Sequence, residues 1–155
     1  MLNFRIFGHS IDEIDKSITM FLQKYSHRLL RYSLGIVFFW FGALKLVNKS
    51  PANELIEKTV FWFPSNIFIP ILGIWEVAIG IFLIIRKLNR VAIFLLLAQM
   101  VGTFLPLILL PNITFSTFPI VPTLEGQYII KNLVLISAAL VIGSNVREIP
   151  EDKYL

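Results

Sequence analysis

The sequence contains no cysteine and few charged residues, and each shortage excludes classes of function. Without cysteine the chain forms no disulfide, does no thiol redox chemistry, and has no cysteine-ligated zinc or iron–sulfur site. Only 15% of its 155 residues are charged, against about 25% in typical soluble domains. The net charge of +4 comes from basic residues at the ends of apolar runs. That placement predicts no nucleic-acid partner, because no basic patch with interleaved aromatic residues exists.

The sequence also lacks the short motifs that mark common enzymes. It has no GxSxG, no Walker loop, no HExxH and no paired-carboxylate acid–base motif. Its two histidines, His9 and His27, stand apart from any carboxylate cluster, so we expect no metal site. The chain alone therefore does not identify itself as an enzyme. No cofactor is predicted, and a quinone is left open.

Apolar residues dominate what is present. They make up 56% of the chain and include 14 phenylalanines. Four runs each approach the roughly 20 residues that a helix needs to cross a hydrocarbon core of about 30 Å. These runs are residues 29–47, 67–85, 91–110 and 126–146. The sequence thus predicts an all-α integral membrane four-helix bundle whose first partner is the lipid bilayer.

The segments around the spans complete the expected organisation. Residues 1–27 contain an amphipathic helix with a capping box at Ser10 and Glu13. Its apolar face predicts that it lies on the membrane surface or docks on the protein's own cytoplasmic end. A short interfacial helix is expected after the first span, capped by Ser50. The membrane domain takes residues 28–147, and residues 148–155 form a tail.

Lysine and arginine predict the orientation of the spans. Basic residues precede the first span, fill the turn between the second and third, and follow the fourth. The loop after the first span mixes both signs, and "PNITFSTFPIVPT" after the third carries no charge. We expect Phe115 and Phe118 of that loop to be buried. The positive-inside rule then places both termini in the cytoplasm.

Polar residues inside the spans form the candidate site. A charge at the centre of a membrane helix costs about 2.5–3.5 kcal/mol on insertion scales, so such residues need a reason. Helical spacing puts each polar group on a face shared with small residues, where helices approach closely. The candidate ligand-binding residues are Lys45, Glu76, Gln99, Gln127, Lys131 and Asn132, with Trp40 and Trp75 as walls.

The rise per residue gives the expected depth of these groups. Lys131 lies roughly 9 Å and Glu76 roughly 14 Å below the outer ends of their spans, and Lys45 lies near the outer rim. We therefore expect Glu76 to pair with Lys131. The resulting polar ladder predicts a pocket open to the outer face. The alternative is that the ladder only sets helix register, as buried polar groups do in some proteins.

Three stretches carry a resemblance to a known family. They are "RYSLGIVFFWFGALKL", "GIWEVAIGIFLII" and "TLEGQYIIKNLVLISAALVIGS". In this order they resemble the YkgB-type, RclC-like inner-membrane proteins of reactive-chlorine resistance, within the DoxX-like four-helix group. The resemblance covers about residues 28–146, and "EGQYIIKN" is its most specific part. Recurring polar positions of the family correspond to Lys45, Glu76, Glu125, Gln127, Lys131 and Asn132, and no catalytic role comes with them.

The resemblance implies a bacterial inner-membrane protein linked to oxidative or reactive-chlorine stress. With the ladder, it favours a pocket that binds a small amphipathic or anionic molecule, such as a quinone or a lipid headgroup. A membrane subunit of a quinone-linked redox complex is the first alternative. An assembly or scaffold protein and an oligomeric transporter are the others. A homodimer or a membrane redox partner is left open.

Overall fold

The structure, a computed structural model, describes residues 5–6 and 9–144. Four helical segments in this part of the chain are long and apolar enough to cross a membrane. They are Asp12–Leu46, Ser65–Ile84, Arg86–Leu109 and Leu124–Ser144. The expected helical fold and four spans are confirmed at this level. The expected tail, residues 148–155, lies outside the described residues.

Helix α1 runs without a break from Ile11 to Leu46, after a short antiparallel pair formed by Arg5–Ile6 (β1) and His9–Ser10 (β2). The sequence predicted a separate surface helix within residues 1–27, and the structure instead joins it to the first span. No glycine or proline stands between residues 11 and 34 to interrupt the helix. Its 36 residues span about 54 Å, well beyond a hydrocarbon core of about 30 Å.

Asn48 ends α1. It adopts a left-handed conformation with φ of 55°, which asparagine tolerates better than most residues. The backbone N–H of Lys49 donates to the carbonyl of Leu44 at 2.8 Å, and that of Asn48 to the carbonyl of Lys45 at 3.1 Å. This is the Schellman arrangement, which satisfies the last carbonyls of a helix. The chain reverses here and enters Asn53–Thr59 (α2).

Two pairs of glycines bring α1 against Ser65–Ile84 (α3). Gly42 faces Gly73, and Gly35 faces Gly80, so the antiparallel helices touch backbone to backbone. A Cβ built on Gly42 would lie 2.6 Å from the carbonyl oxygen of Gly73, which is closer than real side chains come. Small residues at a membrane helix interface permit this approach. The sequence placed these glycines on facing sides, and the structure confirms it.

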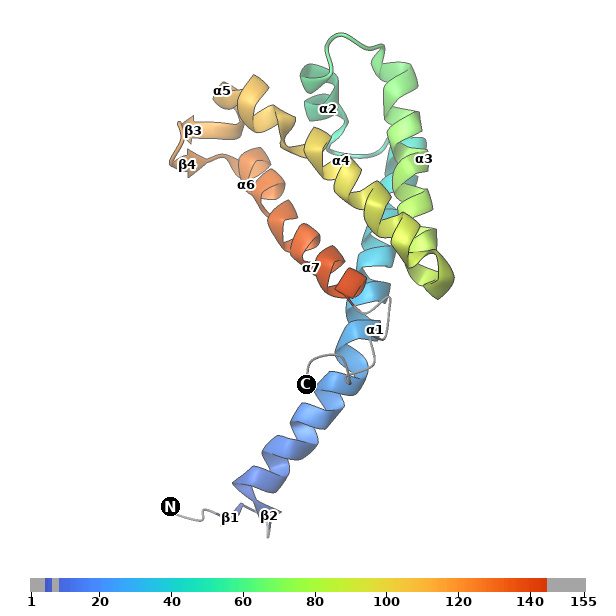
Figure 1. Cartoon of the computed structure of the whole chain (residues 1–155). Helices are drawn as coiled ribbons and strands as arrows, with labels where there is room; N and C mark the ends of the chain where they lie inside the picture. The colour runs from blue at the N-terminus through green and yellow to red at the C-terminus, as the bar shows by residue number, and fades with distance from the viewer. Residues whose placement is uncertain (1–4, 7–8, 145–155) are drawn as a thin grey trace, which may run out of the picture.

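The remaining spans close the bundle. A 3-10 turn, Arg86–Leu88 (η1), leads into Asn89–Leu109 (α4), which packs against α3 and against Asn132–Ser144 (α7). Helix α7 also contacts α1. Ile79, Leu83, Leu96 and Ala139 are fully buried between these helices. Figure 1 shows that the C-terminal end of α7 meets α1, while Leu124–Ile130 (α6) lies well away from α1.

The end of the bundle opposite η1 carries the longer connections, and we call it the loop end; the η1 end is the turn end. Pro111–Thr114 (α5), Phe115–Thr117 (β3) and Val121–Pro122 (β4) form a compact cap beside α6. Phe118 is 65% exposed and Phe115 half-buried. The expectation that both would be buried was wrong for Phe118, which lies in the turn joining β3 to β4.

The short helix expected after the first span is present as α2. Ser50, predicted as its cap, instead lies with Pro51 in the segment before it. The Ser50 hydroxyl oxygen accepts a hydrogen bond from the Ala52 N–H at 3.3 Å, and α2 itself begins at Asn53. Thr59 at its end is buried, so α2 packs onto the bundle.

Candidate functional site: a buried lysine–glutamate–glutamine cluster

Three of the predicted site residues meet inside the bundle. The Lys45 ammonium (α1) donates to the Oε2 atom of Glu76 (α3) at 2.6 Å. The Gln99 amide (α4) donates to the Oε1 atom of the same carboxylate at 2.7 Å. Lys45 is 6% and Glu76 7% exposed. Both carboxylate oxygens are therefore occupied, and the charged pair is shielded from its surroundings.

The glycine contacts and the direction of helical side chains bring this pair together. Lys45 follows Gly42 by three residues and Glu76 follows Gly73 by three, so both lie on the α1–α3 contact face. Long side chains in helices lean toward the N-terminus of their own helix. In these antiparallel helices, Lys45 thus leans toward the turn end and Glu76 toward the loop end. The two side chains converge.

The expected pairing of Glu76 with Lys131 is wrong. Lys131 is exposed, and its ammonium lies 5.1 Å from the centre of the Tyr128 ring, at the junction of α6 and α7. The depth estimate failed because it placed the ends of all spans in one plane. The Cβ position of Gly73 is 3.1 Å from the Lys45 Cβ, so Lys45 lies about 12 Å below the first residue of α3. Lys45 is not at the rim.

The other predicted polar residues do not join the cluster. Gln127 is exposed and Asn132 half-buried, on helices that pack against α4 and the loop-end cap. The same "EGQYIIKN" stretch contains Gly126, and close packing of α6 against α5 explains why a glycine stands at this position. Its Cα approaches the Thr114 carbonyl so closely that a Cβ would clash. The neighbouring Thr123 hydroxyl donates to the Ile113 carbonyl at 2.7 Å, which fixes α6 to α5.

The two predicted tryptophan walls have different surroundings. Trp75, next to Glu76, is 38% exposed, and its indole N–H donates to the Leu95 carbonyl of α4 at 3.1 Å. It thereby ties α3 to α4 one helical turn from Gln99. Trp40 is 62% exposed on α1, and none of the contacts in the described residues joins it to the cluster.

One acceptor in the cluster is left over. The Gln99 Oε1 atom is buried and has no hydrogen-bond partner among the described residues. The amide orientation is set by Glu76, because the reverse orientation would place a carbonyl oxygen against a carboxylate. A buried, unpaired acceptor costs about 1–3 kcal/mol. The cluster therefore offers an unused acceptor beside a lysine with further N–H donors.

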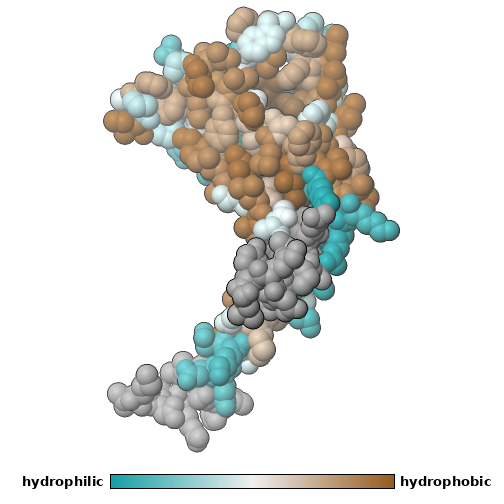
Figure 2. Space-filling model, viewed as in Figure 1, coloured by the Kyte–Doolittle hydropathy of each residue, from teal (hydrophilic) through white to brown (hydrophobic). Residues whose placement is uncertain are grey.

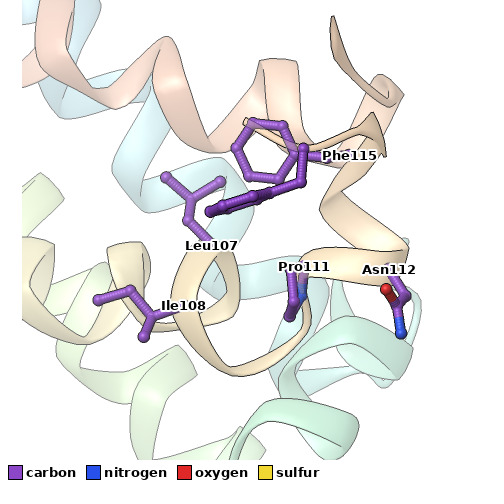
Figure 3. Close-up of a pocket in the computed structure, with 6 residues that line it drawn as sticks. Leu107, Ile108, Pro111, Asn112 and Phe115 are labelled. Carbon is purple, nitrogen blue, oxygen red and sulfur yellow. The ribbon is translucent and has the colours of Figure 1, made fainter. Parts of the chain in front are cut away.

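A separate hollow of about 500 Å³ lies at the loop end (Figure 3). Its lining is almost wholly apolar and comes from α4, α5 and the loop-end cap: Leu107, Ile108, Pro111, Asn112, Phe115 and Phe118. The rings of Phe115 and Phe118 meet edge to face at 5.3 Å between centroids. None of the predicted site residues lines it, so it is not the polar pocket expected from the sequence.

The described residues contain no group of three or more histidine, aspartate and glutamate side chains that could hold a metal. The cluster itself has one carboxylate, already occupied by Lys45 and Gln99. Its unused hydrogen-bonding group among the described residues is the Gln99 Oε1 acceptor. No protein-family model, curated protein or solved structure matches the chain.

Proposed function

We propose that the chain is a small bacterial plasma-membrane protein whose Lys45–Glu76–Gln99 cluster binds the polar group of a small amphipathic molecule. Its link to oxidative or reactive-chlorine stress rests on the resemblance of "FGALK", "GIWEVAIG" and "EGQYIIKN" to the YkgB-type proteins. Both termini lie in the cytoplasm in this proposal, following the basic residues at the turn end. Charged groups within membrane helices are functional candidates by default.

The observation that carries the proposal is the buried, unpaired Oε1 atom of Gln99 beside the Lys45–Glu76 pair. Glu76 already neutralises Lys45, so the cluster has no net charge to attract an anion. It presents an acceptor on Gln99 and spare N–H donors on Lys45 instead. A hydroxyl group both donates and accepts, so it satisfies both. Quinols and glycerol-based headgroups have such a group on an apolar body.

These contacts give less support to the alternative functions, a redox subunit or a transporter. A redox subunit needs a partner that supplies the electron carrier, and a transporter needs a polar path through the membrane. Toward the turn end the bundle interior is filled by apolar side chains, among them Leu34, Ile79, Leu83 and Leu96. That packing favours a binding site over a through-path for ions.

The proposal is tested with Gln99→Leu, which removes the unpaired acceptor together with the N–H that donates to Glu76 and keeps the side-chain size similar. The matched control is Lys131→Met, which removes a charge outside the cluster. Purified proteins are titrated with a short-chain hydroquinone while the emission of Trp75 is followed, with Trp40 and Trp62 replaced by phenylalanine. We expect the parent and Lys131→Met to bind alike and Gln99→Leu to lose affinity by about tenfold or more, as loss of a buried hydrogen bond implies.

The same variants are then compared in cells exposed to hypochlorite. Gln99→Leu should lose protection although it inserts at the parental level, and Lys131→Met should keep it. Equal binding and equal protection by Gln99→Leu and the parent would show that the cluster serves helix packing alone.

A further inference from the structure

The N-terminal half of α1 leaves the bundle as a lone helix. The Cβ position of Gly35 is 3.2 Å from Ile84, the last residue of α3. Residues of α1 that precede about Arg31 therefore lie beyond the turn end, over a length of about 30 Å. Figure 1 shows this extension, and Figure 2 shows hydrophilic surface where the apolar surface of the bundle ends. Residues 12–29 are exposed throughout.

An unbroken apolar stripe follows this extension into the membrane-spanning part of α1. Large apolar side chains recur at alternating spacings of four and three residues, each between 41% and 67% exposed. We call this stripe the α1 seam: Ile18, Leu22, Tyr25, Leu29, Tyr32, Ile36 and Phe39. The spacing averages 3.5 residues, which is the period of helices that coil around one another.

The part of the bundle that the structure describes does not cover the seam. The buried residues of α1 are Leu34, Gly35, Phe38, Gly42 and Lys45, which lie on another face. Lipid can cover the seam at Ile36 and Phe39, but Ile18 and Leu22 lie beyond the turn end. A lone amphipathic helix in water gains little stability without a packing partner. The extension therefore needs a cover that lipid does not provide.

The distribution of charge disfavours the membrane surface as that cover. Asp12, Glu13 and Asp15 gather at the far tip of the extension, where a surface-lying helix would bring them to anionic headgroups. Lys24, Arg28 and Arg31 lie nearest the bundle, which is where basic residues suit the membrane boundary. Acidic residues at the tip and basic residues near the bundle are the order expected of a helix that stands out from the membrane.

The positions beside the seam fit a parallel copy of the same helix. In heptad order Thr19, Ser26 and Ser33 flank the seam on one side, and all three are small and uncharged. Arg28 lies on the other side, which faces Ser33 of a parallel partner rather than its own counterpart. Lys16, Lys24 and Arg31 fall on outer positions. Between Ile18 and Phe39 two copies therefore meet along the seam without like charges in contact, and Asp15, at the next position before Ile18, marks where the seam ends.

We propose that α1 pairs in parallel with α1 of a second copy along the α1 seam. A soluble partner could cover only the extension, and a membrane partner without a long helix could cover only the span. A second copy supplies an apolar stripe of the same period and length in both environments. The seam also runs from Ile18 to Phe39, which is three heptads, the length at which such patterns become specific.

The absence of native cysteine allows a direct test by disulfide formation. Single cysteines replace Leu22, Tyr25 or Leu29 in the seam, and Met20, Gln23 or Lys16 as exposed controls on the outer face. The full-length proteins are oxidised in native membranes and separated without reductant. A disulfide needs Cα atoms within about 7 Å, so we expect dimers at the seam positions and several-fold less at the controls.

A second variant guards against chance collisions. Ile18→Glu with Leu22→Glu, placed in the Leu29→Cys protein, should reduce the dimer several-fold without lowering membrane insertion. No dimer at any seam position, equal dimer at the controls, or a dimer unaffected by the two glutamates would each overturn the proposal. Seam cysteines that are shielded from a water-soluble maleimide yet form no dimer would place the extension on the membrane surface, which also overturns it.

Discussion

At the scale of single residues, the Lys45–Glu76 pair gives the sharpest prediction. Removing one partner of a buried ion pair leaves an uncompensated charge, which costs about 3–5 kcal/mol. Glu76→Gln should lower the free energy of unfolding in detergent micelles by an amount of this order. The double variant Lys45→Met with Glu76→Gln should recover most of the loss, because a neutral apolar replacement leaves no charge behind.

Glu54 and Lys58 in α2 provide the matched control. The Lys58 ammonium and the Glu54 carboxylate are also 2.6 Å apart, but the side chain of Glu54 is 79% exposed and that of Lys58 is 50% exposed. The hydrogen bond from Lys58, and then its charge, lower the pKa of the Glu54 carboxyl. Solvent screens this pair, so Glu54→Gln should leave the unfolding free energy unchanged within error. An equal loss in Glu54→Gln and Glu76→Gln would mean that burial does not set the cost.

At the scale of elements, the glycine contacts between α1 and α3 can be tested against a glycine that has no neighbour. A Cβ on Gly42 would meet backbone atoms of Gly73 and Val77 at 2.6 and 2.7 Å, whereas nothing lies within 4 Å of one on Gly102. Gly42→Ala should force the helices apart and cost about 1–3 kcal/mol. Gly102→Ala in α4 should be neutral or stabilise by up to about 1 kcal/mol, since alanine favours helix.

Thermal unfolding of the two alanine variants in the same detergent measures this difference. Gly42→Ala should also weaken the Lys45–Glu76 contact, because both residues lie one turn from the glycine pair. A stabilised Gly42→Ala protein would show that α1 and α3 do not approach as closely as the structure has them.

The same elements show what the sequence could and could not predict. Periodicity located the four spans, although the first helix begins at Ile11 and not near residue 29. It also put the small residues Gly35, Gly42, Gly73 and Gly80 on the inward faces of their spans. It further named Lys45, Glu76 and Gln99 among its polar candidates, and the structure brings these three together. It chose the wrong partner for Glu76 because depth was counted from the ends of apolar runs. The Schellman end at Asn48 halts α1 below the first residue of α3, and only the three-dimensional packing reveals that offset.

The surface helix was misjudged for a related reason. Ile14, Ile18 and Leu22, on the apolar face expected for that helix, are exposed on α1. Amphipathicity does not say what covers the face. We expected the first helix to end before the first apolar run, although no residue between Lys24 and Leu30 breaks a helix. Because α1 is continuous, this segment is an extension that stands out from the bundle and not a separate helix on the membrane surface.

At the scale of the whole molecule, the orientation of the bundle decides which compartment each end meets. Arg86, Lys87 and Arg90 lie at the turn end, beside the point where α1 leaves the bundle. The loop end mixes Lys49 and Lys58 with Glu54 and Glu57. A membrane protein with this asymmetry should hold its turn end in the cytoplasm. The Lys45–Glu76–Gln99 cluster then lies near the middle of the bilayer, since Gln99 is ten residues from either end of α4, and the α1 extension stands in the cytoplasm.

Cysteine accessibility tests this orientation, since every introduced cysteine is unique in the chain. Lys87→Cys marks the turn end and Asn112→Cys the loop end, and both positions are exposed. A membrane-impermeant maleimide added to spheroplasts should label Asn112→Cys and reach Lys87→Cys only after the membrane is opened. The reverse pattern would put the turn end and the α1 extension outside the cytoplasm, and the proposed orientation would be overturned.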